Sequence, residues 1–266
     1  MRIGDLPVHP ISDGTFVARP SYFGPALASD TRPDVFNQRG TAWLPIGCFL
    51  IRTADRVVLV DAGLGPQQQQ LADGMQLVGG QLLTRLAAVG TAPENITDVV
   101  CTHLHSDHIG WLFDLEARPV FGYATIWFGA SDWDHFVNGP GDMYPHVRDG
   151  FRRLHSSLLR PVDRDVSVAP GVTTLSTPGH TPGHLSVLIT SGRERALLLG
   201  DAITCPLQLD EPAWHSMGDM DVALADHTRE QLWREMEQPR VIGVGSHFPD
   251  LRFGRVLAGA DRRWAS

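Results

Sequence analysis

The chain has 266 residues, 42% of them hydrophobic, and a formal net charge of −8 at pH 7. This size and composition allow a sizeable core, so we expect residues 1–266 to form a single domain. The acidic balance excludes the basic surface that nucleic-acid binding needs, and no apolar run approaches the length of a membrane-spanning helix. All 22 basic residues are arginine, which excludes chemistry that depends on a reactive lysine.

The three cysteines, Cys48, Cys101 and Cys205, lie far apart and include no Cys-x-x-Cys pair. This usage is typical of a reducing compartment and argues against a thiolate zinc site. The amino terminus lacks the apolar run of a signal peptide. We therefore expect a cytoplasmic protein whose partner is a small-molecule substrate, with neither nucleic acid nor membrane as a partner.

Strands and helices are predicted to alternate along the chain. Residues 1–40 predict an edge strand and a long loop, an N-terminal extension whose apolar residues could mediate a homodimer. Further on, apolar β-branched runs predict strands, and apolar residues three or four apart predict helices. The strands are expected at 46–52, 57–61, 96–101, 119–121, 125–128, 172–175, 185–190, 196–201 and 241–244, and the helices at 81–89, within 130–160 and at 227–237. This order predicts two packed sheets with helices outside them.

The most informative motif is His-x-His-x-Asp-His over residues 103–108. It follows the predicted strand 96–101, so His103 and His105, two residues apart, project in the same direction if the strand continues. Asp107 and His108 would then begin a short helix. Three imidazoles and a carboxylate within six residues suit zinc or a similar divalent cation, and chance placement in a polar loop is a much weaker explanation.

Further candidate ligands follow other predicted strands or turns. His180 and His184 lie on a turn rich in glycine and proline, which fixes side chains at little entropic cost. Asp201 ends the apolar run 197–200, where a carboxylate needs a cation or hydrogen bonds. His247 follows the predicted strand 241–244 in the same way.

Together these motifs resemble the metallo-β-lactamase superfamily of binuclear metallohydrolases, over roughly residues 40–250. The resemblance implies an α/β (α+β) fold, a four-layer αβ/βα sandwich, with two divalent cations in a cleft at one edge. Zinc is the first choice, and Mn, Fe or Co are alternatives. The implied ligands are His103, His105 and His184 for the first cation, Asp107, His108 and His247 for the second, and Asp201 for both. The resemblance also implies that Asp61 supports the histidine loop and that His180 is an outer neighbour rather than a ligand.

Details around Asp201 resemble the lactonase and methyl parathion hydrolase-like group. Asp201 itself argues against the β-lactamases, and His105 argues against the oxygen-reducing diiron branch, which usually has Glu there. Thr204 stands where acyl-homoserine lactonases usually have a tyrosine, which counts against quorum signals and leaves other lactones and esters open. The implied activity is hydrolysis of a small lactone, aryl ester or phosphotriester.

The implied mechanism uses hydroxide generated from a water shared by two metals, with Asp107 and Asp201 as catalytic carboxylates that could also take its proton. Aromatic and polar side chains near the motifs are candidates for the substrate pocket, where they would favour an apolar or aromatic leaving group. These candidates are Trp111, Trp133, Phe136, Thr204 and Trp214.

Three alternatives stay open on the same fold. A glutathione-type thioesterase is one, although the segment after His247 is short for a substrate-binding helical domain. An iron-dependent dioxygenase is the second, and a catalytically silent module that binds a metabolite is the third.

Overall fold

The computed structural model describes residues 1–24, 27, 32–211, 213–257 and 263–266. Within them, one sheet has nine strands in the order β5-β6-β2-β3-β4-β7-β8-β9, with β1 paired to β2. Its strands are β1 Arg2–Ile3, β2 Leu6–Ala18, β3 Ala42–Arg52, β4 Val57–Val60, β5 Gln68–Gln70, β6 Gln76–Val78, β7 Asp98–Val100, β8 Thr125–Gly129 and β9 Leu159–Val162.

A second sheet has the strand order β10-β11-β12-β13-β14, and β15 pairs with β16 separately. These strands are β10 Val166–Ala169, β11 Val172–Ser176, β12 Leu185–Ser191, β13 Glu194–Leu198, β14 Val241–Val244, β15 Arg255–Leu257 and β16 Arg263–Ala265. The helices are α1 Leu82–Ala88, α2 Ser106–Ile109, α3 Ala130–Asp132, α4 Pro145–Arg153, α5 Leu207–Asp210 and α6 Val222–Met236. The shorter helical turns are η1 Pro20–Tyr22, η2 Ala72–Gly74, η3 Pro93–Asn95, η4 Trp133–Val137, η5 Ser156–Leu158 and η6 Pro249–Leu251.

Alternating side chains of the central strands separate two apolar cores. In β3, Phe49 and Ile51 belong to the cluster that contains Ile189 of the second sheet, so they point between the sheets. Leu50, between them in sequence, belongs to the cluster that contains Leu82 of α1. Successive residues of a strand point to opposite faces, and both faces of this strand are therefore covered.

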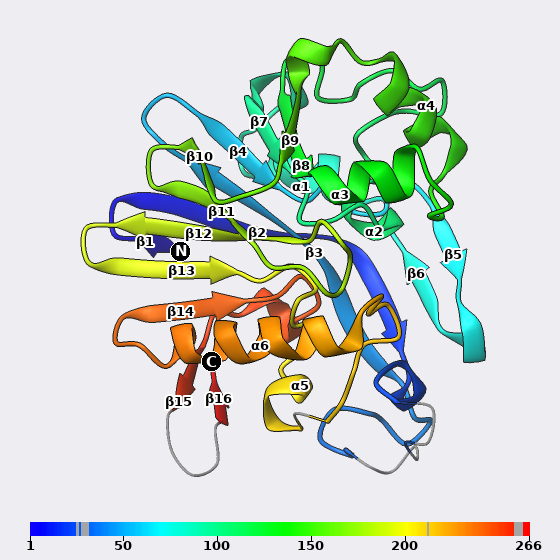
Figure 1. The fold of residues 1–266 in the computed structure, drawn as a ribbon, viewed down its shortest axis with the longest axis vertical. Helices are drawn as coiled ribbons and strands as arrows, with labels where there is room; N and C mark the ends of the chain where they lie inside the picture. Colours follow the sequence, from blue (N-terminus) through cyan, green and yellow to red (C-terminus); the bar gives the residue numbers. More distant parts are fainter. Residues whose placement is uncertain (25–26, 28–31, 212, 258–262) are drawn as a thin grey trace.

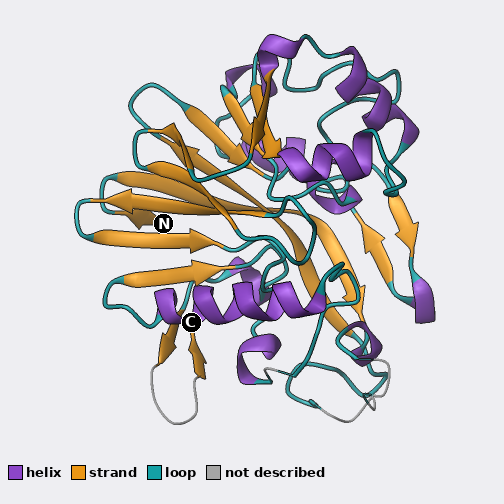
Figure 2. Ribbon diagram, viewed as in Figure 1, coloured by secondary structure: helices purple, strands orange, loops and turns teal. Residues whose placement is uncertain are grey.

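Helices cover the outer face of each sheet and complete four layers. On α6, Leu232, Trp233 and Met236 pack into the cluster between the sheets and the helix. Figure 1 shows α6 beside β14, with α3 and α4 on the far side of the sheets near β8 and β9. Figure 2 shows the strands as a central block flanked by helices. The four-layer αβ/βα sandwich predicted from the sequence is confirmed.

The strand in residues 1–40 was predicted at the edge of a sheet, but the structure places it inside the sheet. β2 runs for 13 residues and pairs on one side with β3 and on the other with β6, so it lies inside the sheet. Its apolar side chains Val8, Ile11 and Phe16 are 0–3% exposed and belong to the core. The apolar surface expected to mediate a homodimer is therefore absent from this strand; part of the predicted loop, residues 25–26 and 28–31, lies outside the described residues.

Several element boundaries also differ from the prediction. Residues 68–70, which lie outside the predicted strands, form β5. Residues 119–121 make a single β-bridge, Phe113 with Pro119, instead of a strand. Helix α6 begins five residues before the predicted start because the Asp221 side chain accepts a hydrogen bond from Leu224 N at 3.0 Å.

Among the described helices, none combines the length and apolar character needed to cross a membrane.

Candidate metal centre

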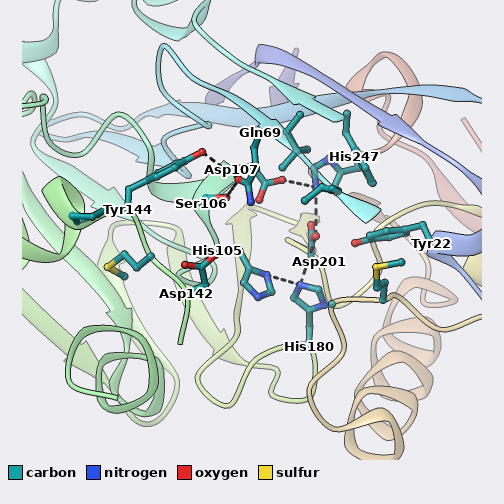
Figure 3. A pocket seen from close by; sticks show the side chains of 17 residues that line it. Tyr22, Gln69, His105, Ser106, Asp107, Asp142, Tyr144, His180, Asp201 and His247 are labelled. Carbon is teal, nitrogen blue, oxygen red and sulfur yellow. Dashed lines mark hydrogen bonds and ion pairs between the residues drawn. The ribbon is translucent and has the colours of Figure 1, made fainter. Parts of the chain in front are cut away.

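The candidate ligands lie where parallel strands of both sheets end. β4 runs parallel to β7, and β13 runs parallel to β14. His103 follows β7, Asp201 follows β13 and His247 follows β14. Because parallel strands bring their carboxyl ends to one edge, these three side chains meet although they are far apart in sequence. Figure 3 shows His105, Asp107, His180, Asp201 and His247 around one cavity.

The first set of donor atoms comes from three histidines. His103 Nε2 lies 2.9 Å from His105 Nδ1, and His180 Nε2 lies 3.1 Å from the same atom. His103 and His180 are buried, at 0% and 1% exposure. Three imidazole nitrogens that converge on one point are the donor set that zinc and related cations prefer.

The second set combines a carboxylate with two histidines. His247 Nε2 lies 3.4 Å from Asp107 Oδ2, and His108 Nε2 lies 3.7 Å from the same oxygen. His108 and His247 are each 1% exposed, and Asp107 is 9% exposed. Asp107 and His108 reach the site because α2 begins directly after the first two histidines.

Asp201 lies between the two sets. Its Oδ2 atom is 3.7 Å from His180 Nε2 and 3.4 Å from His247 Nε2, while Oδ1 is 3.6 Å from His108 Nε2. Among the described residues, Asp201 Oδ1 and His108 Nε2 are buried without any hydrogen-bond partner. Unpaired buried polar atoms are costly, and cations in both sets would satisfy them, so these residues fit a pair of metal ions.

In three of the histidines, the ring nitrogen that faces away from the site, Nδ1, contacts an oxygen of the protein. His108 Nδ1 lies 2.8 Å from Asp61 Oδ2, His180 Nδ1 lies 3.0 Å from Asp219 Oδ1, and His247 Nδ1 donates to Pro45 O at 2.7 Å. Such contacts fix the ring orientation and leave Nε2 directed at the site. The supporting role that the sequence analysis assigned to Asp61 stays a prediction; in the structure its carboxylate lies beside the His108 ring.

His184 and His180 occupy the reverse of their predicted places. The buried His184 ring has Nδ1 2.9 Å from Thr177 Oγ1, and its Nε2 accepts the Asp201 backbone N–H at 3.0 Å. Both of its nitrogens are engaged, and it belongs to none of the donor sets found among the described residues. His184 therefore contacts the Asp201 backbone, while His180 lies in the candidate donor set where the sequence analysis expected His184.

Burial and neighbouring charges shift the pKa values of these side chains. Burial lowers the pKa of His103 well below its usual range and, with His180 nearby, lowers the pKa of His105 to about 3, so both rings keep free lone pairs. Burial alone would raise the pKa of Asp107, but the His108 and His247 charges bring it down to about 2. Asp107 is therefore an ionised carboxylate.

Two supporting carboxylates were missed by the sequence analysis. Asp132 accepts hydrogen bonds from Leu104 N, Gly183 N and Thr181 Oγ1, at 3.2, 2.6 and 2.9 Å, and so ties together the two loops that carry the first donor set. Burial raises the pKa of Asp132. Asp219 supports His180 in turn. Asp132 lies in the stretch predicted as helical, 130–160, and Asp219 lies outside the predicted elements, so nothing in the local pattern marks either aspartate.

A cavity of about 360 Å³ opens beside the donor atoms. Much of its wall is apolar and comes from the start of the chain, the β5–β6 region and two loops. The apolar members include Phe16, Leu71, Leu77, Met143, Pro145, Met217 and the ring of Tyr144. Its polar wall includes Tyr22, Gln69, Ser106 and Asp142, and the structure places no arginine on it among the described residues.

None of the five predicted pocket residues lines this cavity. Trp111 donates to Asp13 Oδ1 at 2.8 Å, and Trp133 stacks on Phe128 with ring centroids 5.3 Å apart. Phe136 is buried with its ring against His105.

The other two predicted pocket residues, Thr204 and Trp214, also contact other parts of the protein instead of lining the cavity. Thr204 is buried and donates its backbone N–H to Gln208 Oε1, and Trp214 packs against Phe23. All five side chains therefore pack outside the lining of this cavity, so the structure gives none of them a direct contact with a substrate there.

Comparison with known proteins identifies the family. The metallo-beta-lactamase superfamily matches residues 41–240, and the chain belongs to this superfamily. The N-acyl homoserine lactonase AiiA of Bacillus thuringiensis subsp. kurstaki is 28% identical over 169 residues, which are 59% of this chain and 62% of that protein. A probable metallo-hydrolase of Mycobacterium tuberculosis is 27% identical over 178 residues, 58% of this chain and 55% of its own. The chain thus spans less than two thirds of the curated relatives it matches.

Solved structures share the whole fold at lower identity. AidC, a dizinc quorum-quenching lactonase in complex with a product, has a TM-score of 0.86 and 22% identity, covering 100% of this chain and 95% of its own. The hydrolase AbOPH, in the beta lactamase superfamily, has a TM-score of 0.81 and 20% identity, covering 99% and 95%. At these identities the likeness establishes the fold.

Proposed function

We propose that this protein is a binuclear metal-dependent hydrolase that opens the ring of a small lactone. The observation that carries the proposal is the position of Asp201 between two complete donor sets. Membership of the superfamily and the similarity to N-acyl homoserine lactonases support hydrolysis of a cyclic ester.

The proposed ligands follow the geometry of the structure. They are His103, His105 and His180 for the first cation, Asp107, His108 and His247 for the second, and Asp201 for both. Zinc suits these donors best, and Mn, Fe or Co are compatible with them. When bound, two divalent cations lower the pKa of a water molecule and polarise the oxygen of the substrate.

Carboxylates of the chain can carry the proton from the attacking water to the leaving alcohol. Ring opening joins the oxygen of water to the carbonyl carbon, breaks the ring C–O bond and delivers one proton to the departing alcohol oxygen. Asp107 and Asp201 both lie beside this reaction. The Asp201 side chain is 4% exposed and its backbone is held by His184, whereas the Asp107 side chain is 12% exposed at the cavity. We therefore assign the mobile proton to Asp107.

The cavity wall supports a substrate with an apolar substituent. Phe16, Leu77 and Met143 offer an apolar surface, which favours an acyl chain or ring next to the reacting ester. An aryl ester or phosphotriester with an aromatic leaving group is the second candidate, since Tyr22 and Tyr144 also line the wall.

Two alternatives receive less support from the site. A glutathione conjugate carries carboxylates, whereas the described wall offers no arginine and includes Asp142. An iron-dependent dioxygenase is less favoured because His105 supplies a nitrogen to the first donor set, and Asp201 completes a site with two adjacent sets.

A substrate screen tests the proposal. Purified protein loaded with zinc or manganese would be assayed against γ-lactones with short and long acyl chains, aryl esters, phosphotriesters and thioesters. We expect the highest kcat/KM for a lactone, and no turnover by the Asp201→Ala variant. A wild-type protein that binds two metals yet hydrolyses no lactone would contradict the proposal, and a preference for phosphotriesters would favour the second candidate.

We also propose that the protein works in the cytoplasm. The three cysteines are free and buried, which supports a reducing compartment. Immunoblotting of separated cell fractions tests this proposal by showing which fraction contains the protein.

A further inference from the structure

We propose that the Tyr22 hydroxyl donates a hydrogen bond to the substrate oxygen that gains negative charge during ring opening, and that Ser216 positions this hydroxyl. The inference rests on the proposed hydrolase function and names a residue that stabilises its transition state. Tyr22 ends the short turn η1 and lines the cavity, where Figure 3 shows its hydroxyl directed toward Asp201.

The hydrogen bonds around Tyr22 leave its proton free to be donated. Ser216 Oγ donates to the Tyr22 hydroxyl oxygen at 2.8 Å, and Ser216 Oγ itself accepts from Gly218 N at 3.1 Å. Among the described residues, the Tyr22 hydroxyl accepts this one hydrogen bond and donates none. Burial and the nearby Asp201 carboxylate raise the pKa of the Tyr22 phenol above its usual value, so the hydroxyl keeps its proton at neutral pH and is available as a donor.

The other hydroxyl groups on the wall are already used as donors. Tyr144 donates to Gln69 Oε1 at 3.2 Å, and Ser106 Oγ donates to the same oxygen at 2.7 Å. Both protons therefore point away from a substrate. Tyr22 differs from Tyr144 in having its oxygen, rather than its hydrogen, held by the protein.

The ring of Tyr22 is fixed before any substrate arrives. It packs edge-on against Phe16 and Phe23, with ring centroids 4.9 and 5.1 Å apart, and its carbonyl oxygen accepts from Met217 N at 2.8 Å. A donor held in one orientation needs no reorganisation when charge develops on the substrate, which is the property that makes such groups effective.

One turn connects the phenol to the first donor set. Ser216 N donates to Asp219 Oδ2 at 2.9 Å, and Asp219 Oδ1 lies 3.0 Å from His180 Nδ1. Residues 216–219 thus orient Tyr22 through Ser216 and His180 through Asp219. Because both are fixed by the same turn, the phenol has a defined place relative to the reaction site.

The test compares Tyr22→Phe, Ser216→Ala and the control Tyr123→Phe. Tyr123 is 79% exposed, so its change removes the same hydroxyl far from the cavity. With a γ-lactone, we expect Tyr22→Phe to lower kcat on the order of 10²-fold with little change in KM, as for loss of one transition-state donor. Ser216→Ala should lower kcat less, and Tyr123→Phe should match the wild type.

A second readout does not require turnover. Calorimetry would measure binding of methyl hexylphosphonate, a charged tetrahedral analogue, to zinc-loaded wild type and variants, after metal analysis confirms equal zinc content. Tyr22→Phe should weaken binding by at least about tenfold, the value of a hydrogen bond to a charged group.

The outcomes separate the two proposals. Equal affinities of wild type and Tyr22→Phe, loss of zinc from Tyr22→Phe, or no binding by the wild type would overturn the role of Tyr22. Binding that depends on Tyr22, in a protein that hydrolyses no lactone, would uphold Tyr22 and overturn the lactonase proposal.

Discussion

At the scale of single residues, the structure separates two histidines that the sequence presents alike. Residues 177–180 and 181–184 have the same sequence, Thr-Pro-Gly-His. His180 Nε2 lies close to His105 Nδ1, whereas His184 lies directly before β12 and accepts the Asp201 N–H. Local sequence cannot distinguish two identical turns, because the difference arises from what each ring meets in the folded chain.

Replacing these two histidines in turn tests the assignment. We expect His180→Ala to lose about one bound zinc per chain because it removes a ligand. His184→Ala should keep both ions with affinity reduced about 10- to 100-fold, as for other residues that support ligands. Equilibrium dialysis with metal analysis measures both values.

The comparison contains its own control, since both changes remove the same side chain from equivalent tetrapeptides. If His184→Ala lost one ion at saturating zinc and His180→Ala kept two, the sequence-based assignment would be right and the geometric one wrong.

At the scale of elements, a single buried aspartate fastens the loops around the site. Asp13 of β2 is fully buried, and its carboxylate accepts hydrogen bonds from the loop after β4, from the start of α1 and from an indole. The donors are the backbone N–H groups of Leu64, Gly65, Gly80, Gln81 and Leu82, and Trp111 Nε1. Since these donors come from three separate stretches of chain, Asp13 holds together elements that strand pairing alone does not connect.

Asp13→Ala should therefore destabilise the fold strongly. It leaves several buried donors without an acceptor, and we expect a loss of at least about 3 kcal/mol in the free energy of unfolding. Chemical denaturation of the metal-loaded protein measures it. Asp55→Ala, on the exposed turn after β3, should change stability by less than about 0.5 kcal/mol. Similar effects of the two changes would refute the role assigned to Asp13.

The sequence predicted those parts of the site that depend on strand periodicity. His103, Asp201 and His247 each follow a run of apolar residues, and the edge where parallel strands end was therefore foreseeable. The cavity wall was not, because Tyr22 lies in a short irregular turn and Gln69 in a polar run without apolar alternation. Their positions result from packing against residues distant in sequence, which local sequence patterns do not reveal.

At the scale of the whole molecule, two sheets combine to concentrate charge in one buried place. β7 contributes the loop of His103 and His108, while β13 and β14 of the other sheet contribute Asp201 and His247. Asp61, Asp107 and Asp201 are all buried there. Burying several carboxylates together is unfavourable without compensating cations, so metal binding and stability of the two-sheet fold should be coupled.

Metal removal should consequently lower the melting temperature. Ions that bind only the folded state at about 1,000 times their Kd add about 4 kcal/mol, which corresponds to a shift on the order of 10 °C for a chain of this size. Differential scanning calorimetry before and after chelation measures the shift. Zinc should restore it in the wild type and only in part in Asp201→Ala; a melting temperature insensitive to chelation would argue against the coupling.

The most direct test is a crystal structure of the zinc-loaded protein with anomalous diffraction at the zinc edge. The account predicts two peaks about 3.5–4 Å apart, the usual separation in two-metal sites, one beside His180 and one beside His247, with Asp201 touching both. A single peak, or a peak bound by His184 with His180 turned away, would contradict it.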